Sequence, residues 1–231
     1  MSETATQETF RGYAVRREQW AIGRETFEFR WPADMDVLLD DPRTEQRYKA
    51  DGYMPYWALP WPGAILLAEA VLRGEPGRGR PAIEIGCGVG IASVLAARMG
   101  WAVTASDYDE DALAYARLNA ERNGVTLAGT AMIDFRVPLP EPAYNLVLAS
   151  DLLYEQRNCE PVARWIASAL KPGGLAMLSD PYRTAAESFA DHARDAGLTL
   201  RMELVESRAP AGLHHRGRIW YATCTRSSSS T

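Results

Sequence analysis

The spacing of apolar and polar positions changes repeatedly along this chain of 231 residues. From residue 81 onward, short apolar runs alternate with longer stretches in which apolar residues recur every three to four positions. The short runs predict strands and the longer stretches predict helices, because side chains repeat every two residues in a strand and every 3.6 in a helix. We expect strands at residues 81–85, 101–106, 127–133, 144–150, 175–179, 198–205 and 218–225, and helices at 89–99, 110–123, 161–170 and 185–196.

This alternation of strand and helix is typical of a parallel sheet that is covered by helices on both faces. The last two strands have no helix between them, only the polar loop at residues 206–217, and they therefore predict an antiparallel hairpin. The expected fold class is α/β, with a Rossmann-like, seven-stranded and mostly parallel sheet that ends in this hairpin.

The first third of the chain follows a different pattern. Apolar residues fall near period two over residues 10–31, with Gly23 close to a turn, which predicts a β-hairpin. Residues 34–39 are expected to form a short helical or extended piece, and the polar residues 43–53 a loop. An apolar helix is expected at residues 64–72, ended by the Gly-Glu-Pro-Gly sequence that follows it.

These patterns predict a single main domain with an appendage. The expected divisions are an N-terminal extension at residues 1–53, the α/β domain at 54–226, and a serine-rich tail at 227–231 that we expect to be disordered.

A glycine-rich turn follows the first strand of the α/β region, with the sequence E-I-G-C-G-V-G at residues 84–90. Glycines let the backbone turn sharply and approach a ligand closely, since no Cβ intervenes. The turn lacks the Lys and Ser or Thr of a phosphate-binding P-loop, and its third glycine comes one position too early for a dinucleotide fingerprint. An ordinary strand-to-helix turn remains the alternative to a ligand site.

Acidic residues occur at the carboxyl ends of four successive strands, where open α/β sheets bind their ligands. Asp107 follows the glycine turn by about 20 residues, the place from which an acid binds ribose hydroxyls. Asp134 is suited to an adenine amino group, Phe135 to stacking on the ring, and Glu84 to an α-ammonium. Asp151 ends the fourth strand. Such acids also cap helices, but the set as a whole matches S-adenosylmethionine (SAM).

Composition narrows the function further. The net charge of −5 argues against a general nucleic-acid or membrane binder, and no apolar run approaches the ~20 residues of a membrane span. Three scattered cysteines indicate a reducing, cytoplasmic compartment. His214 and His215 are adjacent but lack a third ligand, so we expect no metal site.

Two further motifs carry a resemblance to a known family. The sequence W-A-L-P-W-P-G at residues 57–63 and the sequence D-L-L-Y at 151–154 flank the glycine turn. With that turn, they resemble class I SAM-dependent methyltransferases, and within them the seven-strand protein-lysine methyltransferases of the electron-transfer-flavoprotein β-subunit type. The resemblance implies SAM contacts from Trp61, Glu84, Gly86, Gly88, Asp107, Asp134 and Phe135, and substrate contacts from Asp151 and Tyr154. We place Gly90 and Tyr108 in the same cofactor site, since they belong to the same turn and strand end.

The resemblance favours methyl transfer to a lysine ε-amine of a protein, with Asp151 and Tyr154 at the reacting end. The expected partner is the electron-transfer flavoprotein β subunit or another protein with an acidic surface, which Arg208, Arg216 and Arg218 would meet. We expect a monomer. Two alternatives stay open: a small-molecule N- or O-methyltransferase, and a catalytically silent SAM-binding protein.

Overall fold

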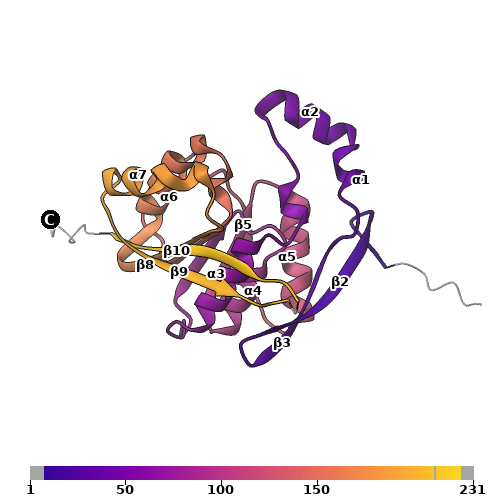
Figure 1. The fold of residues 1–231 in the computed structure, drawn as a ribbon, viewed down its shortest axis with the longest axis horizontal. Coiled ribbons are helices and arrows are strands. Elements are labelled where there is room, and N and C mark those ends of the chain that lie inside the picture. The colour runs from indigo at the N-terminus through magenta and orange to yellow at the C-terminus, as the bar shows by residue number, and fades with distance from the viewer. Residues whose placement is uncertain (1–7, 211, 225–231) are drawn as a thin grey trace, which may run out of the picture.

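A seven-stranded sheet forms the centre of the computed structural model, which describes residues 8–210 and 212–224 (Figure 1). The strand order is β6-β5-β4-β7-β8-β10-β9. The strands are β4 (Pro81–Ile85), β5 (Ala102–Asp107), β6 (Gly129–Met132), β7 (Tyr144–Ser150), β8 (Leu170–Asp180), β9 (Leu198–Ser207) and β10 (His215–Cys224). All neighbours from β6 to β8 pair parallel, whereas β10 runs antiparallel to both β8 and β9. The predicted fold class is confirmed.

Helices cover both faces of this sheet (Figure 1). Helices α3 (Pro62–Leu72), α4 (Ile91–Arg98) and α5 (Glu110–Arg122) pack on one face, and α6 (Cys159–Ala169) and α7 (Phe189–Asp195) on the other. Strand β4 is buried on both sides: Ala82 packs with the first group of helices, and Ile83 and Ile85 with the second. This alternation decides which way the acid between them, Glu84, must point.

The N-terminal residues form a separate antiparallel sheet of β1 (Thr9–Phe10), β2 (Tyr13–Ile22) and β3 (Glu25–Pro32). The predicted hairpin and its turn near Gly23 are confirmed. Its aromatic side chains, among them Trp20, Phe29 and Trp31, are buried against α3, α4 and α5. The extension therefore shares a core with the α/β region. Its boundary near residue 53 remains a prediction, and the predicted tail at 227–231 lies outside the described residues.

The expected loop at residues 43–53 is wrong. After the short helix α1 (Asp36–Leu39), these residues form helix α2 (Pro42–Asp51), which projects beside the α/β region (Figure 1). Asp41 caps its first turn by accepting from the Arg43 N–H at 2.8 Å, Pro42 occupies the first helical position, and Gly52 ends it with φ +76°. Helix α2 buries none of its residues, so it has no apolar stripe from which to predict it. The residues at its two ends, Asp41, Pro42 and Gly52, indicate a helix that the spacing of apolar residues does not reveal.

The described residues also form four short 3-10 helices: η1 (Tyr56–Ala58), η2 (Leu152–Tyr154), η3 (Gln156–Asn158) and η4 (Thr184–Ser188). Within the described part of the chain, no helix is long and apolar enough to cross a membrane.

Candidate active site

A cavity of about 690 Å³ opens at the carboxyl ends of β4, β5 and β7, within the usual size range of small-molecule sites. Most of the predicted site residues line it: Trp61, Gly86, Gly88, Asp107, Tyr108, Asp134, Phe135, Asp151 and Tyr154. Glu84 and Gly90 lie beneath its wall instead. Because these residues come from five separate segments of the chain, the fold alone brings them together.

The glycine turn forms the floor of this cavity. Gly86 and Gly88 have φ values of +61° and +50°, which disfavour any other residue. A Cβ on Gly86 would lie 2.4 Å from the Leu152 side chain, and one on Gly88 would lie 3.2 Å from the Trp57 carbonyl oxygen. Gly90 serves packing, since a Cβ there would meet Ala116 of α5 at 2.7 Å. Gly86 and Gly88 therefore present bare backbone to the cavity.

Asp107 holds this turn in place from the end of β5. Its carboxylate accepts from the Gly88 N–H at 2.9 Å and from the Asp109 N–H at 3.1 Å. Burial raises the pKa of Asp107 to about 6, although these backbone donors favour its charged form. Asp107 therefore fixes the turn and also lines the cavity.

Glu84 points away from the cavity, toward α4. One carboxylate oxygen accepts from the Ser93 backbone N–H at 2.7 Å and from the Ser93 hydroxyl at 2.5 Å. The other oxygen, Oε1, is buried without a hydrogen-bond partner among the described residues. Burial raises the pKa of Glu84 to about 8, with Ser93 opposing the shift. Glu84 is thus an acid held in an unfavourable environment directly below the glycine turn.

The opposite wall carries Asp134, Phe135 and Tyr108. Both oxygens of Asp134 are held by the Arg136 side chain at 2.8 and 2.9 Å, which lowers the pKa of Asp134. The Arg136 guanidinium lies 5.4 Å from the centre of the Tyr108 ring. Phe135 is partly buried against the core and contributes its ring to the cavity. This wall combines flat aromatic surfaces with a charged pair.

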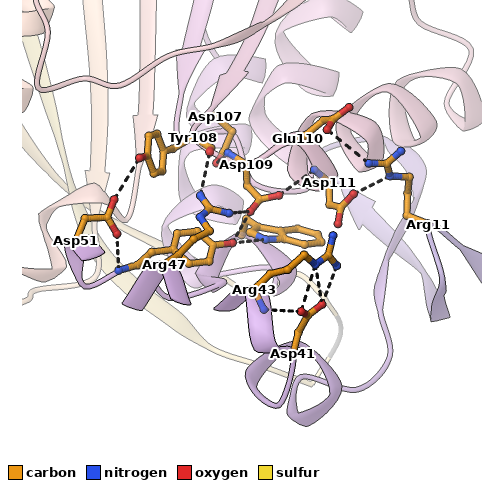
Figure 2. A network of polar contacts seen from close by, with 12 residues as sticks. Arg11, Asp41, Arg43, Arg47, Asp51, Asp107, Tyr108, Asp109, Glu110 and Asp111 are labelled. Carbon is orange, nitrogen blue, oxygen red and sulfur yellow. Dashed lines mark hydrogen bonds and ion pairs between the residues drawn. The ribbon is translucent and has the colours of Figure 1, made fainter. Parts of the chain in front are cut away.

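Polar contacts join helix α2 to the Tyr108 end of this wall, as Figure 2 shows. Arg47 of α2 donates to the Asp109 carboxylate at 2.7 Å and to the Tyr108 carbonyl oxygen at 3.2 Å. The Tyr108 hydroxyl donates to Asp51, at the end of α2, at 3.2 Å. Tyr53 also donates to Asp109 and receives a hydrogen bond from the Trp57 indole N–H at 3.2 Å. Polar contacts, with one stacked arginine, therefore dock α2 beside the cavity.

At the other end of the cavity, Asp151 is held in a constrained position. It is buried and has φ +55°, a left-handed conformation that Asp tolerates better than most residues. Its backbone N–H donates to Ser179 on β8, and its Oδ1 accepts from Arg183 at 3.1 Å. Its Oδ2 is buried against the Gly63 backbone, whose N–H favours the charged carboxylate, and a Cβ on Gly63 would approach this oxygen to 2.2 Å. Burial raises the pKa of Asp151, and Arg183 opposes this.

Aromatic rings surround the approach to Asp151. Tyr56 packs edge-on against Trp61, with ring centres 5.9 Å apart, and against Tyr154, with centres 5.3 Å apart. Tyr56 and Tyr154 are each more than a third exposed, so the rings reach the cavity mouth. Rings around an acid favour a cationic guest, because the ring faces carry negative potential.

Sequence reasoning missed Gly63 and Arg183, which contact Asp151, as well as Arg47 and Arg136 on the other wall. One expected role is wrong: Arg218 is not a surface residue that meets a partner, because its side chain is buried against Asp180 at 3.0 Å. Arg208 and Arg216 are exposed. Among the described residues, no group of three or more His, Cys, Asp or Glu side chains is arranged to hold a metal ion.

Comparison with known proteins places this site in a family. Residues 65–221 match the model of the methyltransferase domain. The chain belongs to this family. The match covers well over half of the chain, including the glycine turn and the large sheet as far as residue 221 of β10.

Individual relatives differ in what they act on. The electron transfer flavoprotein beta subunit lysine methyltransferase of Danio rerio is 32% identical over 142 residues, covering 60% of this chain and 53% of that protein. The ubiquinone biosynthesis O-methyltransferase of Paramagnetospirillum magneticum is 34% identical over 122 residues, covering 51% of this chain and 46% of that protein. The chain thus spans about half the length of these relatives. The TrmN structure from Thermus thermophilus shares the fold, with a TM-score of 0.54, 24% identity, and coverage of 70% of this chain and 48% of that one.

The family and the fold imply S-adenosyl-L-methionine as the cofactor. The residues of the cavity fit it. Gly86 and Gly88 line the cavity with backbone alone, Asp107 stands at the end of β5, and Phe135 also lines the cavity. The unpartnered Oε1 of Glu84 is a further polar atom below this turn.

Proposed function

We propose that this protein is a SAM-dependent methyltransferase that acts on a lysine ε-amine of a protein. The observation that carries the proposal is the buried carboxylate of Asp151 in a cavity that Tyr56, Trp61 and Tyr154 also line. A carboxylate in a cavity lined by aromatic side chains is suited to an alkylammonium group, which carries both charge and apolar surface. The similarity to the lysine methyltransferase of Danio rerio supports the same acceptor.

The cofactor would be held by the glycine turn, Asp107 and the wall at Asp134 and Phe135, with Glu84 below the turn. When bound, SAM supplies an electrophilic methyl group. The protein's part is to bring a nucleophile to it in a dry and fixed position, which accounts for much of the rate in such reactions.

The acceptor amine must lose a proton before it can react, because only the neutral form has a free lone pair. A free lysine has a pKa of about 10.4. Transfer into the buried end of the cavity lowers that pKa, since burial penalises the charged form. Asp151 would first bind and orient the amine by accepting hydrogen bonds from the N–H groups of the amine. Tyr154 and Tyr56 would wall the channel and exclude water.

One observation favours a second function. The O-methyltransferase of Paramagnetospirillum magneticum is slightly more identical to this chain than the lysine methyltransferase is. A small-molecule hydroxyl acceptor therefore remains the second candidate. A hydroxyl acceptor would not need the Asp151 carboxylate as an ion-pair partner, because a hydroxyl group is neutral.

The test is transfer of tritium from methyl-labelled SAM. Purified electron transfer flavoprotein β subunit and a whole bacterial lysate serve as acceptors, and the products are separated by gel and by filtration. Label on a protein band at lysine, lost with Asp151→Asn while SAM still binds by calorimetry, supports the proposal. Asn tolerates the left-handed backbone at this position, so the variant tests charge rather than folding. Label only in the filtrate favours the small-molecule enzyme.

A further inference from the structure

Arg183 is the side chain that pairs with Asp151, and it comes from a different part of the chain. It lies in the loop between β8 and η4 and lines the cavity. Its Nη2 donates to Asp151 Oδ1 at 3.1 Å, and its guanidinium lies 5.7 Å from the centre of the Trp61 ring. The Arg183 side chain is 31% exposed, whereas that of Asp151 is 8% exposed. Arg183 thus reaches from the cavity into the fold to meet a buried acid.

The loop that carries Arg183 is anchored by its backbone. The Arg183 N–H donates to Asp180 at 3.1 Å, and the Arg183 carbonyl oxygen accepts from Arg218. Asp180 and Arg218 form their own buried pair at 3.0 Å. Because these contacts do not use the Arg183 side chain, the loop has no need of the guanidinium to keep its shape.

The charges around Asp151 indicate what the Arg183 guanidinium does. A buried carboxylate without a partner shifts toward its protonated form, because burial penalises the charge. The other charged groups that face this pair are Asp180 at the end of β8, Arg218 of β10 and Glu187 of η4. Arg218 is bound to both of those acids. That leaves Arg183 as the cation in contact with Asp151 among the described residues.

Resting on the proposed function, we propose that Arg183 is a positioning residue for the acceptor site: by holding Asp151 Oδ1, it fixes the carboxylate that would orient the acceptor amine and keeps it ionised. Its charge has a second effect. A full carboxylate charge facing the acceptor would stabilise the unreactive ammonium, whereas a paired carboxylate orients the amine with less penalty for losing the proton.

The test is a titration that needs no acceptor. The full chain is labelled with ¹³C at the aspartate side-chain carboxyl carbon, and the Asp151 signal is assigned by its loss in Asp151→Asn. An opposite charge within ~4–6 Å lowers a carboxyl pKa by about 1 to 3 units. The midpoint of Asp151 is therefore expected to rise by about 1 to 3 pH units in Arg183→Gln. An unchanged midpoint would overturn the proposal.

Two more variants sharpen this result. Arg157→Gln removes another arginine of the same cavity, one that pairs with Glu155, and is expected to leave the Asp151 midpoint where it is. Arg183→Lys keeps a charge and is expected to restore the midpoint to within about half a unit. If Arg183→Gln proves too unstable to study, Arg183→Lys alone decides. A rise of a full pH unit or more in the Asp151 midpoint of Arg183→Lys would overturn the proposal, because lysine keeps the positive charge.

Activity gives the second readout. With whichever protein takes the label, Arg183→Gln is expected to move the acidic limb of the pH–kcat profile to higher pH while SAM affinity stays unchanged. A uniform loss at every pH indicates a merely structural role and contradicts the proposal. If no protein is labelled but the Asp151 midpoint rises, the acceptor assignment fails and the pairing role of Arg183 stands.

Discussion

Asn119 of α5 and Arg30 of β3 are joined by two hydrogen bonds in which a side-chain amide takes the place of a neighbouring strand. Asn119 Oδ1 accepts from the Arg30 N–H at 2.8 Å, and Asn119 Nδ2 donates to the Arg30 carbonyl oxygen at 2.9 Å. Asn123 repeats this pattern with Glu28 at 2.9 and 2.7 Å. Four residues of an α-helix rise about 6 Å, and two residues of a strand rise about 6.6 Å, so the two asparagines match alternate residues of β3.

Asn119→Ala is expected to destabilise the protein by about 2–4 kcal/mol, because it leaves a buried N–H and carbonyl of Arg30 without partners. Asn119 is fully buried, whereas Asn123 is half-buried. Asn123→Ala is therefore expected to cost only about 1 kcal/mol, since water replaces part of what is lost. Urea unfolding measures both, and equal losses would contradict the difference in burial.

Gly63→Ala is expected to reduce methyl transfer by about 100-fold, because the new Cβ would stand 2.2 Å from Asp151 Oδ2 and push the carboxylate out of place. Alanine is otherwise the better helix former, so propensity alone predicts a more stable α3. The control is Gly129→Ala on β6, where a Cβ meets nothing within 4 Å. Steady-state kinetics with the labelled acceptor compares the two, and full activity of Gly63→Ala would show that Asp151 is not held where the structure has it.

Glu84 makes stability depend on pH. Its pKa is raised from the ordinary 4.5 to about 8 in the fold, so between these values the folded protein binds more protons than the unfolded chain. The contribution of Glu84 to the free energy of unfolding is therefore greatest below pH ~4.5. It falls by about 1.4 kcal/mol per pH unit from there to pH ~8. Asp107 adds a similar fall that ends near its pKa of about 6.

The window from pH 6 to 8 thus isolates Glu84 from Asp107. Glu84→Gln is expected to flatten the fall in this window, as its amide oxygen can still accept from Ser93. Chemical unfolding at several pH values without SAM measures the slope. A variant with the same slope as the original protein would assign the dependence to another group.

Arg47 is expected to control how firmly α2 is docked. Arg47→Ala removes the contacts to Asp109 and Tyr108, and α2 has no buried side chain to compensate. We expect amide hydrogen exchange in residues 42–51 to accelerate about tenfold, with a global loss of only about 1 kcal/mol. Arg43→Ala serves as the control, since Arg43 is exposed and mainly pairs with Asp41 on its own helix. Equal acceleration in both variants would contradict the role of Arg47.

The sequence predicts what depends on local periodicity or on a short motif. The alternation of strands and helices, the glycine turn and the acids at strand ends are all visible in it. Helix α2 escapes prediction because docking by polar side chains leaves no apolar stripe.

Arg183 escapes for a different reason. It follows β8, whereas Asp151 follows β7, and only the pairing of Ser150 with Ser179 makes these two strand ends neighbours. No spacing along the chain encodes that proximity. The direction of Glu84, in contrast, was available from its neighbours, since Ala82 shares its side of β4 and packs under α4.

The amide of Asn119 has a consequence for anyone who recombines this protein with its relatives. Its Nδ2 also donates to the Val89 carbonyl oxygen, at 2.8 Å, inside the glycine turn. One side chain therefore fastens strand β3 and the glycine turn to the same helix. A chimera that grafts a foreign N-terminal segment onto this α/β region must carry a matching partner for α5, or it will disturb the turn as well as the graft. The two parts are not interchangeable modules.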